Sequence, residues 1–331
     1  MKILITGGAG FIGSHLVKHL VKKYQNYDII NLDSLTYAGN LSNLTNIQFL
    51  SNYRFIQGDI RNYEFITSLF DIEKFDCVIH LAAESHVDNS IEDPFIFAQT
   101  NVLGTLNLLE CFKNNYNAKN KKALFFHVST DEVYGSLEEH DPSFSEDSKI
   151  DPNSPYSASK ASSDLFVKAY SSTFEIPYII SNCSNNYGEN QFEEKLIPKI
   201  ISKAIKGETI PIYGDGENIR DWLYVKDHVR AIDALLHSNI KNQKFNIGGG
   251  TELSNNDLVK RICNMLDSKL NRKIGISRKL IKHVKDRPGH DKRYSVNSKK
   301  LIEKVNWLPK VSIEDGLGKT IDWYISKLNN K

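Results

Sequence analysis

Two short segments of the chain carry side chains that could move protons: residues 129–135, STDEVYG, and residues 156–160, YSASK. Tyr156 and Lys160 are four residues apart in a helical pattern over 156–174, so we expect both on one face of a helix. A free tyrosine has a pKa of about 10, and a neighbouring cation favours its phenolate, so Lys160 could make Tyr156 a base near neutral pH. An isolated pair of this kind is more often an ordinary surface contact, so its meaning depends on the rest of the chain.

Thr130, Asp131 and Glu132 supply a hydroxyl and two carboxyl groups directly after an apolar run, residues 123–128. Such a run is typical of a buried strand. Open α/β sheets bind ligands at the carboxyl ends of their strands, so these side chains are expected at a ligand crevice. The two carboxyl groups could serve as a general acid and a general base; the alternative is an acidic pair that starts a helix.

A nucleotide-binding pattern occupies the N-terminal end of the chain. A predicted strand, residues 2–6, is followed by the glycines Gly7, Gly10 and Gly13 and by an amphipathic helical pattern. Glycines in this position let the backbone approach a pyrophosphate at the helix N-terminus. Asp33 ends the next predicted strand, twenty residues after Gly13. A carboxylate there accepts hydrogen bonds from the adenosine ribose and repels a 2′-phosphate, which predicts NAD rather than NADP and makes a helix-cap or turn role for Asp33 the lesser alternative.

Later strand ends complete the expected cofactor site. Asp59 could accept a hydrogen bond from the adenine amine while Ile60 packs on the ring, and the small residues after 77–81 would lie near the nicotinamide half. His80 is interpreted as a packed core residue and His86 as an orienting group. The full set expected at NAD is Gly7, Gly10, Phe11, Ile12, Gly13, Asp33, Ser34, Thr36, Asp59, Ile60, Leu81, Ala82, Ala83, Ser85, Thr100, Tyr156, Lys160 and Asn186.

Alternation of strand and helix patterns sets the expected fold class. Six predicted strands, the sixth at 178–181, are separated by helices, which is typical of a Rossmann-like, doubly wound parallel sheet. A more irregular C-terminal half predicts a smaller mixed α/β lobe that holds the substrate. We expect the NAD-binding domain to comprise residues 1–187 plus about 221–250, and the lobe residues 188–220 plus about 251–331.

Composition excludes several function classes. The 331 residues include 42 basic and 40 acidic side chains, a net charge of +2, so nothing favours nucleic acid or a membrane surface as a partner. The four cysteines are far apart and form no metal-ligand spacing, so no metal site is expected and reduced thiols are predicted. No apolar run is long enough to span a bilayer or to act as a signal peptide. We therefore expect a cytoplasmic protein.

The C-terminal half carries three candidate cations: Lys195 in a helix predicted over about 192–206, and Arg220 and Arg287 in turn-rich segments. They could form part of a solvated face, or they could contact a diphosphate through charge-assisted hydrogen bonds. Spacing alone leaves these two interpretations open.

Several segments together resemble the nucleotide-sugar 4,6-dehydratases of the extended short-chain dehydrogenase/reductase family, in particular the dTDP-glucose 4,6-dehydratases. They are LDSLTYAGNL, HLAAESHVD, STDEVYG, YSASKASSD, NCSNNYG, EKLIP, GDGENIRDWLYVKDH, NIGGG, DRPGHDKRY and GLGKTIDWY, in that order. The resemblance covers essentially the whole chain. It departs at Asn89, where the family usually has arginine, and at Glu189 and Glu193, where the family often has proline.

The resemblance implies an NAD-binding Rossmann domain, a lobe that holds dTDP-glucose, and a homodimer formed through the helices over 94–113 and 156–174. It implies substrate contacts at Ser85, Thr130, Asn185, Lys195, Leu196, Pro211, Tyr213, Arg220, Asn255, Arg287 and His290.

The chemistry expected of such an enzyme divides among the five candidate catalytic residues. Tyr156 would take the C4 hydroxyl proton, aided by Lys160, while Thr130 bonds the C4 oxygen. Glu132 would remove the C5 proton as general base, and Asp131 would protonate the departing C6 hydroxyl. A 4-epimerase, a dehydratase for another nucleotide and a non-catalytic NAD-binding regulator are the alternatives; the acid pair argues against the epimerase, and the intact Tyr-Lys pair against the regulator.

Overall fold

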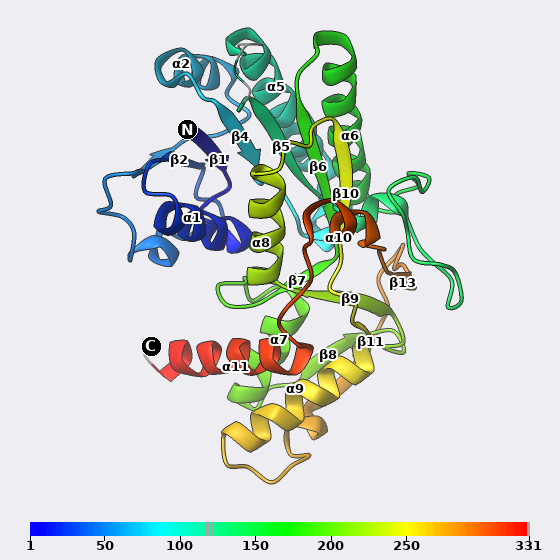
Figure 1. The fold of residues 1–331 in the computed structure, drawn as a ribbon. Coiled ribbons are helices and arrows are strands. Elements are labelled where there is room, and N and C mark those ends of the chain that lie inside the picture. The colour runs from blue at the N-terminus through cyan, green and yellow to red at the C-terminus, as the bar shows by residue number, and fades with distance from the viewer. Residues whose placement is uncertain (117–119, 121, 330–331) are drawn as a thin grey trace.

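A parallel sheet of seven strands forms the centre of the larger part of the molecule (Figure 1). The computed structural model describes residues 1–116, 120 and 122–329. The strand order is β10-β6-β5-β4-β1-β2-β3, and every neighbouring pair is parallel. This order confirms the predicted doubly wound, Rossmann-like sheet. The strands are β1 (Lys2–Thr6), β2 (Asp28–Asp33), β3 (Tyr53–Gln57), β4 (Cys77–His80), β5 (Leu124–Thr130), β6 (Tyr178–Cys183) and β10 (Gln243–Ile247).

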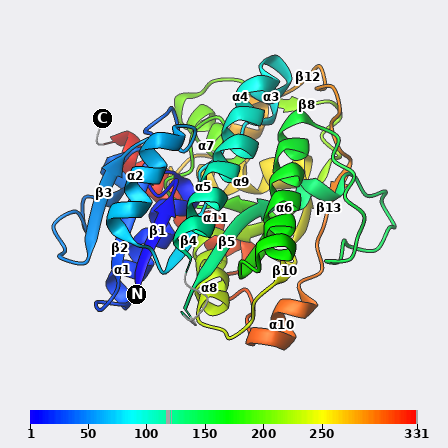
Figure 2. The same cartoon turned by 90° about the horizontal axis from the view of Figure 1, so that it is seen from above.

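Helices cover both faces of this sheet, because alternate side chains of its strands point in opposite directions. On one face, Ile3 and Ile5 of β1 share a core cluster with Leu16 of α1 (Phe11–Lys23) and Ile232 of α8 (Val225–Leu236). On the other face, Leu4 shares a cluster with residues of α2 (Tyr63–Glu73), α5 (Gly104–Asn115) and α6 (Pro155–Phe174). Figure 2 shows these two groups of helices on either side of the strands.

The connection from β4 to β5 contains a change of helical winding. After α3 (Val87–Glu92), the chain forms α4 (Pro94–Phe97), a π-helical segment (Ala98–Leu103) and then α5. The sequence predicted one long helix here, and the difference lies in its middle. Asn101 of the π-helical segment exchanges hydrogen bonds with the backbone of Glu84, at 2.8 and 3.0 Å, and donates to Ser159 Oγ at 2.8 Å. The altered winding thus ties the loop after β4 to α6, in line with the frequent use of π-bulges at functional sites.

The smaller part is mixed α/β, as predicted. It has a sheet of β7 (Asn185–Tyr187), β9 (Ile219–Tyr224), β11 (Glu252–Ser254) and β13 (Arg293–Tyr294), and a pair of β8 (Ile210–Tyr213) and β12 (Ile281–Val284). The helices α7 (Leu196–Lys206), α9 (Asn255–Lys269) and α11 (Ile313–Asn329) pack around a separate core cluster.

The chain passes between the two parts more than once. β10 joins the large sheet beside β6, and α10 (Lys299–Val305) packs against β10, with Leu301 in the core of the larger part. The sequence-derived domain boundaries stay a prediction.

Within the residues that the structure describes, no helix has the length and apolar character needed to cross a membrane. The same residues contain no cluster of histidine, cysteine and acidic side chains that could hold a metal ion. All four cysteines are buried and free.

Candidate active site

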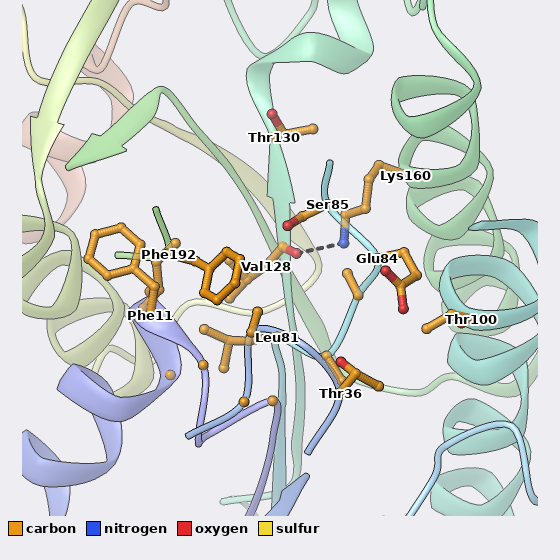
Figure 3. Close-up of a pocket in the computed structure, with 18 of the residues that line it drawn as sticks. Phe11, Thr36, Leu81, Glu84, Ser85, Thr100, Val128, Thr130, Lys160 and Phe192 are labelled. Atoms are coloured by element: carbon orange, nitrogen blue, oxygen red, sulfur yellow. Dashed lines mark hydrogen bonds between the residues drawn. The ribbon is translucent and has the colours of Figure 1, made fainter. Parts of the chain in front are cut away.

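One cavity opens along the carboxyl ends of the strands of the large sheet (Figure 3). Every residue that the sequence predicts at NAD lines it, and so do all five candidate catalytic residues. These residues come from segments as far apart as Gly7 and Asn186. Parallel strands bring them together because their carboxyl ends share one edge of the sheet.

The loop between β1 and α1 fits a pyrophosphate. Gly7 has a φ of 73°, and a Cβ at this position would lie 2.7 Å from Ala82 N. A Cβ on Gly13 would lie 2.1 Å from Gly7 O, so both positions require glycine. Gly10 precedes α1 without any side-chain cap, and the first turn has no acidic residue. The N-terminus of α1 therefore remains available to an anion that enters the cavity.

Asp33 lies at the end of β2 on the cavity wall, as the NAD prediction requires. Its Oδ2 accepts a hydrogen bond from Ala9 N and its Oδ1 one from Leu35 N, both at 2.9 Å. The carboxylate is thus fixed between the glycine loop and the loop after β2. These contacts and the glycine loop together fit a dinucleotide cofactor.

Asp59 and Ile60 also line the cavity, but Asp59 has a partner that the sequence analysis missed. Arg61 donates from Nε and Nη2 to Asp59 Oδ2 at 2.9 and 2.6 Å, and Arg61 itself lines the cavity. The two residues are only two positions apart, so no motif marked this ion pair. The acceptor proposed for the adenine amine is therefore shared with a guanidinium.

Thr130 and the acid pair, Asp131 and Glu132, lie where β5 passes into a short 3₁₀ helix (Asp131–Tyr134). Thr130 caps this helix: its Oγ1 accepts from Glu132 N and donates to Asp131 Oδ1, each at 3.3 Å. Ser157 Oγ, from α6, donates to Glu132 Oε2 at 3.3 Å. Asp131 is 1% exposed, and its Oδ2 has no hydrogen-bond partner in the described chain. An unpartnered buried carboxyl oxygen on a cavity wall suits a group that exchanges a proton with a ligand.

The surroundings separate the proton affinities of the two carboxyl groups. Burial raises the pKa of Asp131 well above its usual value, and the adjacent charge of Glu132 adds to this. Burial also raises the pKa of Glu132, but Arg287, Lys195 and Arg220 oppose that rise. Asp131 is therefore the better holder of a proton and Glu132 the more readily ionised group, a separation that suits an acid and a base.

Tyr156 and Lys160 share the face of α6 that lines the cavity, as their spacing predicts. Ser154 fixes the start of this helix, because its Oγ accepts from Ser157 N at 3.1 Å. Lys160 Nζ donates to Val128 O at 2.9 Å, the contact drawn in Figure 3. Burial raises the pKa of Tyr156 well above its usual value and lowers that of Lys160 to about 8. The lowered tyrosine pKa expected from the sequence is not seen in the chain by itself, because burial raises the pKa and the nearby charges of Glu132 and Asp131 add to this.

The residues implied for the substrate fall into two groups. Ser85, Thr130, Asn185 and Lys195 line the cavity, and Lys195 Nζ donates to Ser85 O at 2.7 Å. The others lie outside the cavity lining: Leu196 begins α7, Asn255 begins α9, Pro211 and Tyr213 belong to β8, Arg220 belongs to β9, and Arg287 and His290 follow β12.

Asp88 bridges the larger part to this second group, a contact that the sequence analysis missed. Tyr213 OH donates to Asp88 Oδ2 at 3.2 Å, and Arg287 Nη1 lies 3.5 Å from Asp88 Oδ1. Arg220 is buried, with its guanidinium carbon 4.3 Å from the centre of the Tyr294 ring. Arg220 is thus buried and Arg287 pairs with Asp88, so neither belongs to a fully solvated face.

His80 and His86 both make structural hydrogen bonds. His80 is buried, which confirms its assignment to the core, and it bonds to Thr6 and Thr105. His86 caps α3 by accepting from Asn89 N at 3.3 Å.

Sequence reasoning missed several residues of the cavity wall. The helix expected over 192–206 begins at Leu196 instead, so Phe192 stays in the preceding loop and lines the cavity. Glu189 holds that loop in place, since it accepts from Lys226 Nζ at 2.7 Å and from Tyr224 OH at 2.9 Å. Other lining residues that were not predicted include Leu32, Ala38, Gly39, Gly58, Glu84, Val128, Ser129, Cys183, Ser184, Gln191 and Glu194.

Known proteins match this chain over almost its full length. The family model described as GDP-mannose 4,6 dehydratase matches residues 4–320. A dTDP-glucose 4,6-dehydratase of Escherichia coli is 47% identical over 346 residues, which cover 100% of this chain and 94% of the relative. A dTDP-glucose 4,6-dehydratase of Haemophilus influenzae is 46% identical over 333 residues, which cover 98% of each chain.

Solved structures agree with these matches. The dTDP-glucose 4,6-dehydratase of Streptomyces venezuelae, crystallised with NAD and TYD, superposes with a TM-score of 0.91 at 41% identity and covers 99% of this chain and 98% of that one. The Bacillus anthracis enzyme, in complex with NAD, gives a TM-score of 0.87 at 42% identity with the same coverage. A UDP-glucose 4-epimerase of Thermotoga maritima also reaches 0.87, at 30% identity, covering 99% of this chain and all of its own. This chain belongs to the nucleotide-sugar 4,6-dehydratase family, whose model carries the description GDP-mannose 4,6 dehydratase and which includes the dTDP-glucose 4,6-dehydratases.

Proposed function

We infer that this chain is an NAD-dependent hydro-lyase that converts dTDP-glucose into dTDP-4-keto-6-deoxyglucose and water, a reaction of deoxysugar biosynthesis. The observation that carries this inference is the adjacent pair Asp131 and Glu132, with different proton affinities, on the wall that also holds Tyr156 and Lys160. Oxidation and reduction at one carbon need only the Tyr-Lys pair. Elimination of water needs an acid and a base as well.

The first proton transfer is assigned to Tyr156. Its phenol oxygen takes the proton of the C4 hydroxyl, Thr130 Oγ1 bonds the same oxygen, and Lys160 supplies positive charge that favours the phenolate. When bound, NAD supplies a hydride acceptor for C4, a positively charged ring and, after elimination, a hydride donor for C6. The residues proposed to hold NAD are those that line the cavity from Gly7 to Asn186 and that the sequence predicted.

The elimination is assigned to the acid pair. Oxidation at C4 makes the C5 proton acidic, and Glu132 removes it as general base. Asp131 gives its proton to the C6 hydroxyl, the C6–O bond breaks, and one water leaves. Positioned proton transfers of this kind contribute roughly 10²- to 10⁴-fold each.

The remaining substrate contacts are proposed for the lobe. Lys195, Arg220 and Arg287 offer positive charge for a diphosphate, and each opposes the rise in the pKa of Glu132, so they act electrostatically on the same site. Asn185, Leu196, Pro211, Tyr213, Asn255 and His290 are proposed to contact the rest of the nucleotide sugar. We also propose a homodimer in the cytoplasm, an NAD-binding domain of residues 1–187 plus about 221–250, and a substrate lobe of the remainder.

A single incubation tests the function. Purified protein with dTDP-glucose should yield a 4-keto-6-deoxy product and one equivalent of water, with no net change in NAD. Recovery of a nucleotide sugar inverted at C4, with the C6 hydroxyl retained, would favour the 4-epimerase, whose fold this chain shares. Turnover of UDP- or GDP-glucose in preference to dTDP-glucose would show that the substrate carries a different nucleotide from the one proposed.

A further inference from the structure

A second acidic residue of α6, Asp164, lies one helical turn beyond Lys160 on the same buried face. Its side chain is 2% exposed and does not line the cavity. Asn182 Nδ2 donates to Asp164 Oδ2 at 3.1 Å, and His127 Nε2 lies 3.3 Å from Asp164 Oδ1. Asp164 therefore sits behind the active site, between α6 and the strands β5 and β6, where it can touch neither substrate nor cofactor.

A carboxylate buried in this way needs positive charge nearby. His127 does not supply it at neutral pH, because burial lowers its pKa to about 4. His80, on the neighbouring strand β4, is also kept neutral by burial, which lowers its pKa well below the usual value. The cations that remain around Asp164 are Lys160, fully buried on the same helix face, and Lys244, partly buried beside Tyr134.

Lys160 depends on Asp164 in turn. Burial lowers the pKa of Lys160 to about 8, and Asp164 is the strongest influence that opposes this. The other groups that face the amine are Cys183 of β6, whose influence is smaller, His127 of β5 and His80 of β4, both neutral, and Tyr156 of α6. Lys160 Nζ holds its place through one hydrogen bond, to Val128 O.

We propose that Asp164 is a positioning residue of this active site: its buried carboxylate, one helical turn from Lys160 on the same face of α6, stabilises the positive charge of the amine that serves Tyr156 and the cofactor. The proposal rests on the function inferred above. Asp164 does not line the cavity, so it acts through its neighbours, and Asn182 holds its carboxylate in place.

Two variants separate charge from shape. Asp164→Asn removes the charge but keeps the size and an oxygen that can accept from Asn182. Asp164→Glu keeps the charge and changes the shape by one methylene. The alkaline decline of dTDP-glucose turnover should move to lower pH by about 1 unit in Asp164→Asn, as expected for loss of an opposite charge, and should stay near the wild-type position in Asp164→Glu. A purely structural role predicts the reverse ranking, with the larger loss at every pH in the Glu variant.

A direct measurement does not depend on turnover. In the NAD-bound protein labelled with [ε-¹³C]lysine, the Lys160 signal is assigned by its loss in Lys160→Met and followed against pH. It should titrate at lower pH in Asp164→Asn than in wild type. Equal titration of Lys160 in the two proteins would overturn the proposal, whatever the activities. If wild type makes no 4-keto-6-deoxy product, the proposed function fails instead, and the ¹³C titration still decides the relation between Asp164 and Lys160.

Discussion

The ring of Tyr37 meets the ring of Phe192 edge-on, with their centroids 5.5 Å apart and their planes at 75°. Tyr37 belongs to the loop after β2 and Phe192 to the loop after β7, and Thr36 and Phe192 line the cofactor cavity. The two loops therefore join across the cavity. Glu189, three residues before Phe192, anchors the second loop by accepting hydrogen bonds from Lys226 and Tyr224.

This aromatic pair should slow the escape of NAD. Such a pair contributes about 0.5–1.5 kcal/mol beyond its burial, so Tyr37→Ala and Phe192→Ala should each release NAD roughly 2- to 10-fold faster. The measurement is the rate of NAD loss after dilution. Phe49→Ala, which removes an exposed phenylalanine from another loop, is the matched control. The double variant should release NAD little faster than either single variant does. Fully additive effects on the release rate would mean that the two rings act separately.

Glu132→Gln should stop the reaction after oxidation. The amide keeps the size of the side chain but cannot take the C5 proton. Substrate should still reduce the bound NAD, seen as NADH absorbance, while deuterium uptake at C5 from heavy water should be lost. Exchange of C5 at the wild-type rate in this variant would show that another group is the base.

Asp131→Asn should slow the later step. An amide cannot protonate the departing C6 hydroxyl, so oxidation and C5 exchange should persist while water loss falls by roughly 10²- to 10⁴-fold.

The pH dependence of the wild-type reaction should show the same division between base and acid. Both carboxyl pKa values are raised, so C5 exchange should fall as acid protonates Glu132, and water loss should fall as rising pH removes the Asp131 proton. Identical pH profiles for exchange and water loss would argue against this division.

Asp33 should select NAD. Titration of the protein with both cofactors should show clear preference for NAD, since a carboxylate repels the 2′-phosphate of NADP. Asp33→Asn should weaken the binding of NAD and narrow the difference between the affinities for NAD and NADP. Because Asp33 also accepts hydrogen bonds from Ala9 N and Leu35 N, the variant could lose stability as well as affinity. The midpoint of its thermal unfolding must therefore be measured together with its cofactor binding. Tighter binding of NADP by wild type would refute the assignment.

A homodimer should form through the helices beside the active site. Phe95 of α4 is 76% exposed, and Leu103 and Leu165 are also exposed on neighbouring helical segments of the chain. Burial of such side chains favours association. Light scattering at micromolar concentration should give a dimer mass, and Leu165→Glu should shift it toward the monomer. A monomer mass for wild type would contradict the proposal.

Much of this architecture could be predicted from local patterns. The alternation of strand and helix predicted the sheet, and the glycines Gly7 and Gly13 after the first strand, with Asp33 at the end of the second, predicted the cofactor cavity. Tertiary contacts decided what local patterns do not encode. The run after Pro94 has the pattern of one regular helix, whereas the bonds from Asn101 to Glu84 and Ser159 at its π-helical middle join residues far apart in the sequence.

Electrostatic properties were the least predictable from spacing. The Tyr156–Lys160 pair has the predicted geometry, but the direction of the tyrosine pKa depends on how completely the protein buries it. The same holds for Arg220 and Arg287. Their segments look turn-rich and solvated, whereas the fold directs their charge toward Glu132.

The last strand of the large sheet has a consequence for how the protein is made. β10 pairs along β6 from Gln243 to Ile247, yet the ribosome completes β6 about sixty residues earlier. Until β10 emerges, the nascent chain presents β6, buried at every position in the finished fold, as a bare edge that attracts other strands. A polypeptide cut before Gln243 keeps that edge. The first six strands are therefore not a self-sufficient unit, and completion of the large sheet must wait for synthesis of the part of the lobe that contains β7, β8 and β9.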